Sequence, residues 1–190
     1  MRVGIAHHFG WAVAVTVSAD YQVVDRRRIE LIEPGLPAAP IHHVGGPHLL
    51  HRPAQPLDDQ ALAELVAEVR QSAGRATARG LDELAAALPD PIDSISLRTW
   101  PADFPEDIAI KRRVPYESRA DSVMYCQVLA AVARDRGWAI HPYHAKQVED
   151  DAIRNLGEQA SEVLDRAKSK MGPPWTKDHR MALAATMAVT

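Results

Sequence analysis

Three segments rich in Val and Ile follow one another within the first 32 residues, and short turns separate them. They are residues 2–6 (RVGIA), 11–18 (WAVAVTVS) and 22–32 (QVVDRRRIELI). β-Branched residues in short runs of this kind are typical of strands. Connections this short join neighbouring antiparallel strands, so the start of the chain predicts a three-stranded antiparallel meander.

Helical and strand-like segments alternate through the rest of the chain. Helical spacing of apolar residues predicts helices over 58–89 and from about 120 to 137, with strands at 92–98 and 138–144. Gly74 and Gly80 allow a kink in the first helix or its division into two. Three more helices are expected at about 146–156, 158–170 and from 176 onward. This order predicts one α/β domain over residues 1–190, with a five-stranded mixed sheet and helices on both faces.

The composition limits the classes of partner. The net charge is −3, which argues against bulk, sequence-blind binding to nucleic acid. No segment approaches the roughly 20 apolar residues that cross a bilayer, so no membrane partner is expected. The single cysteine, Cys126, excludes an internal disulfide and is expected to be a packed thiol in a cytoplasmic protein.

The sequence resembles the ribonuclease H-like superfamily, and within it the bacterial Holliday-junction resolvases. Three stretches carry the resemblance: the opening RVGI with WAVAVTV, the middle VLAAVARDRGWAIHPYHAKQVEDDAI, and the closing KDHRMALAATMA. The terminal Gly-Pro-Pro-Trp and Lys-Asp-His-Arg groups also resemble the ends of a set of bacterial proteins without an assigned function. The resemblance implies a ribonuclease H-like fold and, in principle, hydrolysis of a phosphodiester by two divalent metal ions.

The acidic residues that such a reaction requires are mostly absent. Two Mg²⁺ ions need a set of carboxylate ligands. The first strand is predicted to end at Ala6, where the resemblance implies an Asp, and the fourth strand offers Ser94, Ser96 and Arg98 instead of an acid. In the last helix Asp178 matches the family, but Met181 stands one turn later. The resemblance therefore implies a degenerate active site.

One charged group near the start of the last helix is a candidate site. It consists of Lys177, Asp178, His179 and Arg180. Asp178 there is also explained by the favourable position of an acid in a first helical turn. Alternatively, Asp178 and His179 face His7 or His8 and form a site for a divalent metal such as Zn²⁺ or Mn²⁺, with Lys177 stabilising developing charge.

Two further groups are weaker candidates. A Pro- and Gly-rich segment carries His42, His43, His48 and His51, which form either a metal site or an exposed loop with incidental histidines. A basic group follows the fourth strand and is either a phosphate-binding cluster or a solubilising rim. Its members are Arg98, Lys111, Arg112, Arg113 and Arg119.

The leading interpretation is a ribonuclease H-like binding or structural module that has lost most of its two-metal site. Small residues in the Ala-rich final helix permit close packing, which suggests a homodimer. The alternative is a metal-dependent nuclease or phosphodiesterase that uses Asp178 and His179. Nucleic acid is a possible partner through the basic group, although the net charge does not support it.

Overall fold

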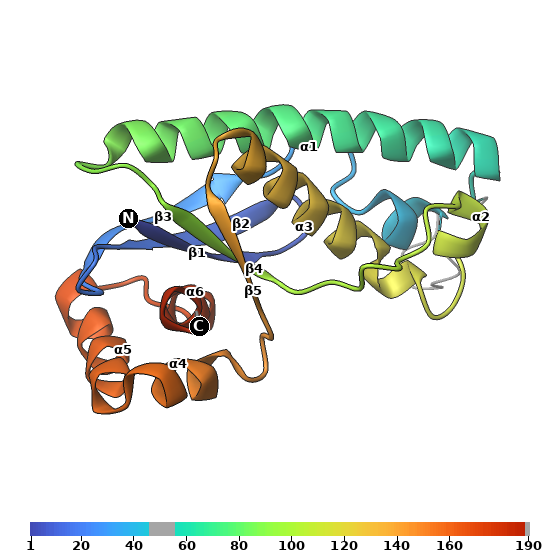
Figure 1. The fold of residues 1–190 in the computed structure, drawn as a ribbon. Coiled ribbons are helices and arrows are strands. Elements are labelled where there is room, and N and C mark those ends of the chain that lie inside the picture. The colour runs from blue at the N-terminus through green and yellow to red at the C-terminus, as the bar shows by residue number, and fades with distance from the viewer. Residues whose placement is uncertain (46–55, 189–190) are drawn as a thin grey trace.

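A five-stranded sheet forms the centre of the protein. The computed structural model describes residues 1–45 and 56–188. The strands are β1 (Arg2–His7), β2 (Trp11–Val17), β3 (Val23–Glu30), β4 (Ser94–Arg98) and β5 (Ala139–Tyr143). Their spatial order is β3-β2-β1-β4-β5, in which β1 to β3 are antiparallel while β4 is parallel to both β1 and β5. The predicted mixed sheet, a meander followed by alternating helices and strands, is confirmed (Figure 1).

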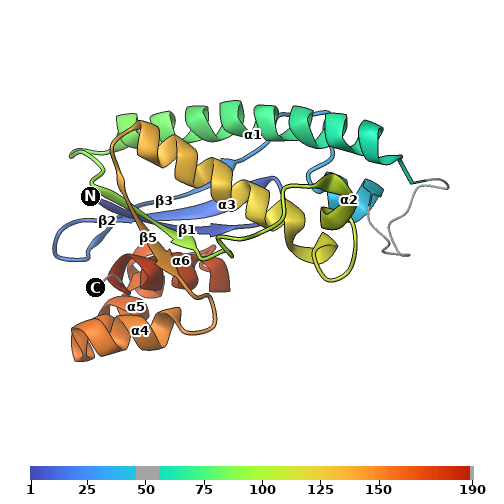
Figure 2. The same cartoon turned by 45° about the vertical axis from the view of Figure 1, so that its right-hand side comes forward.

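Helices cover both faces of this sheet, as predicted (Figures 1 and 2). On one face lie α1 (Asp59–Ala87) and α3 (Glu117–Asp135). On the other lie α4 (Val148–Leu156), α5 (Glu158–Met171) and α6 (Lys177–Met187). Two short elements were not predicted: a π-helical turn, η1 (Pro40–Gly45), and α2 (Ile108–Lys111). No helix in the described ranges is both long and apolar enough to cross a membrane.

The alternation of side chains along the strands divides the core in two. Val3 and Ile5 of β1 belong to the cluster under α1 and α3, whereas Ala6 belongs to the cluster under α4, α5 and α6. In β2, Ala14 faces the first cluster and Val15 the second. A strand that is buried on both faces must be apolar at successive positions, which explains the near-continuous apolar run of β2.

Helix α1 is one continuous helix of 29 residues, so a division into two helices is wrong. The Asp58 side chain caps its start by accepting a hydrogen bond from the Ala61 N–H at 2.8 Å. A Cβ on Gly80 would lie 2.4 Å from Cγ2 of Ile29. Gly80 therefore allows α1 to approach β3 closely, and its sequence signal reflects packing between elements rather than a break.

Helix α6 packs tightly against the central strands. A Cβ on Gly4 in β1 would lie 1.8 Å from the carbonyl oxygen of Ala182. Ala182, Ala184 and Ala185 of α6 are all buried against the sheet and α4. The small side chains that motivated the homodimer prediction thus serve packing within the chain, and self-association stays a prediction.

Candidate functional site

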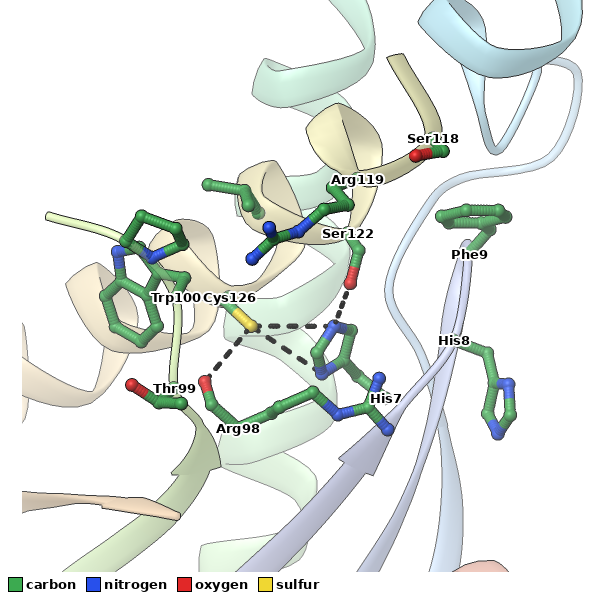
Figure 3. Close-up of a pocket in the computed structure, with 12 residues that line it drawn as sticks. His7, His8, Phe9, Arg98, Thr99, Trp100, Ser118, Arg119, Ser122 and Cys126 are labelled. Atoms are coloured by element: carbon green, nitrogen blue, oxygen red, sulfur yellow. Dashed lines mark hydrogen bonds between the residues drawn. The ribbon is translucent and has the colours of Figure 1, made fainter. Parts of the chain in front are cut away.

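A pocket opens where two parallel strands end side by side. Strands β1 and β4 are parallel neighbours, so their carboxyl ends lie at the same edge of the sheet, where open α/β folds usually bind ligands. The pocket has a volume of about 370 Å³. Its walls come from the end of β1, from β4 and the segment after it, and from the first half of α3 (Figure 3). The lining residues are His7, His8, Phe9, Arg98, Thr99, Trp100, Pro101, Ser118, Arg119, Ser122, Val123 and Cys126.

His7 forms part of the pocket floor. Strand β1 extends one residue beyond its predicted end, so His7 rather than Ala6 is its last residue. The residue is 2% exposed, and Nε2 of its ring lies 2.9 Å from Oγ of Ser122 on α3. Burial, followed by the positive charges of Arg98 and His8, lowers the pKa of His7 to about 3. His7 is therefore a neutral imidazole at physiological pH.

Cys126 lies beside this histidine. Its Sγ is 3.5 Å from Nε2 of His7 and donates to the backbone carbonyl of Arg98 at 3.4 Å. Burial raises the pKa of the thiol to about 12, and the nearby Arg98 offsets only part of that rise. A buried thiol with a raised pKa is a poor nucleophile, in keeping with the packed thiol expected from the sequence.

Arg98 places a cation at the end of β4. Its Nε is buried and has no hydrogen-bond partner among the described residues. Its Nη2 contacts the sulfur of Met181 at 3.9 Å, and its side chain also hydrogen-bonds to Tyr143. Among the described residues that line the pocket, none is Asp or Glu. A partly buried guanidinium without a counterion carries a desolvation cost that an anion in the pocket would offset.

The sequence predicted that the start of the last helix lies close to His7 or His8. The structure shows this contact for His8 only. Nε2 of His8 lies 3.1 Å from Oδ2 of Asp178 in the first turn of α6. The His8 ring also stacks on Trp11, with ring centroids 4.2 Å apart and an interplanar angle of 13°. His7, in contrast, points toward Ser122 and Cys126 of α3 (Figure 3).

The other two members of the predicted catalytic group face elsewhere. Nδ1 of His179 accepts a hydrogen bond from the Thr176 N–H at 3.2 Å and also contacts the Thr176 hydroxyl, so this ring caps α6. Lys177 is exposed and lines a separate hollow with Trp175 and Arg180. The structure thus joins Asp178 to His8 and does not join Asp178, His179 and Lys177 around one point.

The predicted basic cluster is also divided. Arg98 and Arg119 line the pocket. Arg112 instead binds the segment before α1, by donating to the carbonyls of Gly45 and Leu57 and to Asp59. Lys111 pairs with Glu106 at 2.8 Å, and Arg113 is exposed outside the pocket.

A two-metal carboxylate site does not fit the residues present. His7 ends β1, Arg98 ends β4, and α6 presents Asp178 with Met181 one turn later. Within residues 1–45 and 56–188, no three His, Cys, Asp or Glu side chains are grouped so that they could hold a metal ion. Mg²⁺ requires oxygen ligands that neither an arginine nor a neutral imidazole supplies.

The histidine-rich segment is anchored to α3 through one buried carboxylate. Asp121 accepts hydrogen bonds from the backbone N–H groups of Ile41 at 3.2 Å and His42 at 2.8 Å. Burial raises the pKa of Asp121 to about 6, although these two hydrogen bonds lower it. His42 and His43 lie near the Phe9 ring, at centroid distances of 6.0 and 6.1 Å. His48 and His51 lie outside the described residues.

Eight of the twelve lining residues were not among the site residues predicted from the sequence, and they include Phe9, Trp100 and Ser122. A signal for Ser122 was present, because Arg119, Ser122 and Cys126 are spaced i, i+3 and i+7 and so share one face of α3. Phe9 follows the two histidines at the end of β1, and only the packing of α3 above it defines a pocket there. Polar residues on an otherwise apolar helix face were the available clue.

The strand order and the helices on both faces define a ribonuclease H-like fold, the fold that the resemblance implied. Among solved structures, the chain is similar to Thermus thermophilus RuvC in complex with a Holliday junction substrate. The TM-score is 0.52 and the identity 12%, over 98% of this chain and 90% of that chain. A second structure of RuvC from the same organism gives a TM-score of 0.48 and 12% identity, over 98% and 91% of the two chains. No protein-family model matches the sequence, and neither does any curated protein. The likeness shows the fold.

Proposed function

We propose that the chain is a single ribonuclease H-like domain that binds nucleic acid through a phosphate-binding pocket, without a two-metal nuclease site. The observation that carries this proposal is Arg98. Its guanidinium occupies the carboxyl end of β4, its Nε is buried without a hydrogen-bond partner among the described residues, and no described residue lining the pocket is acidic. A phosphate oxygen is a strong hydrogen-bond acceptor with the charge that this position lacks.

Arg119 and His8 support the same interpretation. Arg119 lines the pocket and forms no ion pair with any described residue. His8 adds ring nitrogens at the rim, although Asp178 engages one of them. The positive charge is thus local, which reconciles a phosphate site with a net charge of −3.

The similar RuvC structure favours nucleic acid as the source of the phosphate. That protein was solved in complex with a Holliday junction substrate. A DNA four-way junction is therefore the first probe to use with this chain, alongside a duplex and a single strand of matched sequence.

The test is fluorescence anisotropy with a labelled junction, on the whole chain. We expect binding that Arg98→Met weakens at least tenfold and that Arg119→Gln weakens several-fold, because each substitution removes one charged phosphate contact. Arg113→Gln is the matched control, since Arg113 is exposed outside the pocket, and we expect its affinity to stay within twofold of wild type. Absence of binding to all three probes, or binding insensitive to Arg98→Met, would overturn the proposal.

Arg98→Met also separates a role in binding from a role in folding. An apolar side chain of similar length removes a partly buried cation whose Nε has no hydrogen-bond partner among the described residues. We therefore expect the free energy of unfolding to stay the same or rise by about 1 kcal/mol, since replacing poorly compensated buried charges is often stabilising. Urea unfolding measures it. Strong destabilisation would instead give Arg98 a structural role.

A second candidate function rests on the contact between His8 and Asp178. These residues form a potential metal-ligand pair, and a metal-dependent phosphodiesterase using Asp178 with His8, instead of His179, is the corresponding alternative. Manganese- or zinc-dependent hydrolysis of bis-p-nitrophenyl phosphate that Asp178→Ala abolishes would favour it. Unchanged thermal stability on addition of Zn²⁺, Mn²⁺ or Mg²⁺ and no hydrolysis would favour the binding module.

A further inference from the structure

One tryptophan differs from the other three in its surroundings. The chain contains Trp11, Trp100, Trp138 and Trp175. A guanidinium lies over three of these rings: Arg28 over Trp11 at 4.2 Å from the centroid, Arg136 over Trp138 at 5.9 Å, and Arg26 over Trp175 at 5.8 Å. Trp100 has neither a cation nor a second ring as partner among the described residues, and it lines the pocket. Trp100 also packs against the two apolar clusters beside it, so a ligand can contact only the part of its indole that lines the pocket.

The pocket combines aromatic walls with a cationic floor. Figure 3 shows Trp100 at one side and Phe9 at the other, with Arg119 between them and Arg98 beside His7 below. Hydroxyl groups from Thr99, Ser118 and Ser122 also line it. Planar rings, cations and small hydroxyls within about 370 Å³ match the three parts of a nucleotide, namely base, phosphate and sugar.

We propose that the pocket holds one unpaired nucleotide, with its base stacked on Trp100 and the phosphates on its two sides contacted by Arg98 and Arg119. This inference rests on the proposed function and names the ligand of the same site. Trp100 is preferred to Phe9 as the stacking surface because the His42 and His43 rings already lie near Phe9.

An unpaired nucleotide fits better than the backbone of a duplex. In a duplex the bases are stacked on one another and cannot reach a side chain at the wall of a pocket unless they are extruded. A protein that holds duplex backbone needs many separate cations, whereas Arg112 and Arg180 are engaged in contacts within this chain. Two pocket arginines suit one or two phosphates.

The shared chemistry is that of a nucleoside phosphate, which a free nucleotide or an unpaired position in a strand can supply. The experiment separates these sources by measuring anisotropy with a fluorescein-labelled 12-nucleotide single strand, its duplex, and a version with abasic sites at alternate positions. Unlabelled AMP, dTMP and inorganic phosphate serve as competitors. We expect the single strand to bind at least tenfold more tightly than the duplex, and the abasic strand at least fivefold more weakly than the intact strand.

The dependence of the binding constant on salt concentration gives an independent measure of how many phosphates the pocket contacts. For a single strand, the slope of log K against log of salt concentration is about −0.7 for each phosphate neutralised. Contacts from Arg98 and Arg119 to two phosphates would give a slope of about −1.4. We expect Arg119→Gln to reduce this slope by about half, because one phosphate contact is lost.

Substitutions at two tryptophans test the stacking. Trp100→Leu keeps an apolar side chain but removes the ring, and we expect affinity for the single strand to fall at least fivefold, whereas Trp100→Phe should retain more of it. Trp138→Leu is the matched control outside the pocket and should leave affinity within twofold. Binding should also quench intrinsic fluorescence, and this quenching should disappear in Trp100→Phe while it persists in Trp138→Phe.

The outcomes distinguish the two proposals. Binding that depends on Arg98 but is unchanged by abasic sites and by Trp100→Leu would overturn the nucleotide inference and leave phosphate binding standing. Equal affinity for duplex and single strand would also overturn it. If AMP and dTMP bind much more tightly than inorganic phosphate and the strand does not bind, the site is one for free nucleotides. Absence of binding to every probe would overturn both proposals.

Discussion

Oδ2 of Asp178, in the first turn of α6, lies 3.1 Å from Nε2 of His8, directly after the end of β1. The two residues are 170 positions apart in the sequence. Their contact joins the last helix to the first strand at the rim of the pocket. It also leaves Asp178 as a carboxylate that already has a partner, next to a pocket whose described lining residues include no acid.

Asp178→Asn should change the free energy of unfolding little and should raise the affinity for an oligonucleotide. The His8 side chain is 42% exposed and that of Asp178 25%, so losing the pair should lower the free energy of unfolding by less than about 1 kcal/mol. Because a negative charge near the cationic pocket disappears, affinity for an oligonucleotide should rise about twofold to fivefold. Anisotropy titration measures this change, with the exposed Asp150→Asn as control. A large loss of affinity would mean that the carboxylate itself holds a ligand, such as a metal ion.

His7 should make the fold sensitive to acid. The pKa of His7 is about 3 in the folded protein, whereas that of an ordinary histidine is about 6.5. Between these two pH values the unfolded chain therefore binds a proton that the native state does not bind. The stabilisation is complete above pH 6.5 and is lost as the pH falls toward 3. Between pH 7 and 4, His7 should account for a loss of roughly 3 kcal/mol, since one pKa unit corresponds to about 1.4 kcal/mol.

Urea unfolding of His7→Gln at several pH values between 4 and 7 tests this. Glutamine retains an amide that can face Ser122 but does not titrate in this range. We expect the variant to lose less stability than wild type on acidification, whatever its stability at pH 7. Parallel pH profiles for the two proteins would contradict the prediction.

Asp121 should have the opposite effect to His7 on how stability depends on pH. Its pKa is about 6 in the folded protein, above the ordinary 3.8, so the native state binds the proton more tightly than the unfolded chain does. Its contribution to stability is present below pH 3.8 and is lost as the pH rises through 6. Between pH 7 and 4 it should add roughly 2 kcal/mol and partly offset the loss at His7.

Asp121→Asn removes this contribution while it keeps an oxygen that can accept from Ile41 and His42. Its stability should therefore fall more steeply than that of wild type as the pH is lowered from 7 to 4, in the same urea experiment. A shallower fall would show that the carboxylate is ionised throughout this range.

Gly4→Ala should destabilise the fold by roughly 3 kcal/mol or more. The new methyl group would meet the carbonyl oxygen of Ala182, so α6 would have to move away from β1, and overpacking of this kind costs 1–3 kcal/mol or more. Gly74→Ala is the control, because nothing lies within 4 Å of its Cβ position in α1. That change should raise the free energy of unfolding by up to about 1 kcal/mol. Equal effects of the two substitutions on the urea midpoint would refute the close packing of α6.

Much of the fold could be predicted because its signals are local. Val13, Val15 and Val17 mark a strand by β-branching, and Leu62, Val69 and Ala73 mark a helix by spacing. Gly80 led to the wrong expectation of a break in α1. A glycine is needed there because the Ile29 side chain of β3 leaves no room for a Cβ, and not because the helix ends. The first strand was ended one residue early, since a histidine on its own carries no mark of being buried beneath α3.

The candidate site was predicted only in part. Asp178, His7, His8 and Arg98 were singled out because they stand at strand and helix ends, where the resemblance implied acids. Their actual partners were Ser122, Cys126, Met181 and each other. His179 turned back to cap its own helix, and Arg112 turned to the segment before α1.

The sequence by itself determined the kinds and order of the elements, and it placed Ala6, Arg98 and Met181 where the resemblance implied acidic residues. Backbone preference and side-chain period act over a few neighbouring residues, so both could be predicted without knowing any distant contact. Only the tertiary structure decided that Arg98 stands without a counterion among its described neighbours, that His7 is buried and neutral, and that Trp100 lines a pocket with no cation or second ring against it among the described residues. Desolvation and pairing depend on residues that are distant in the sequence, such as Ser122 beside His7 and Met181 beside Arg98, and no local pattern encodes them.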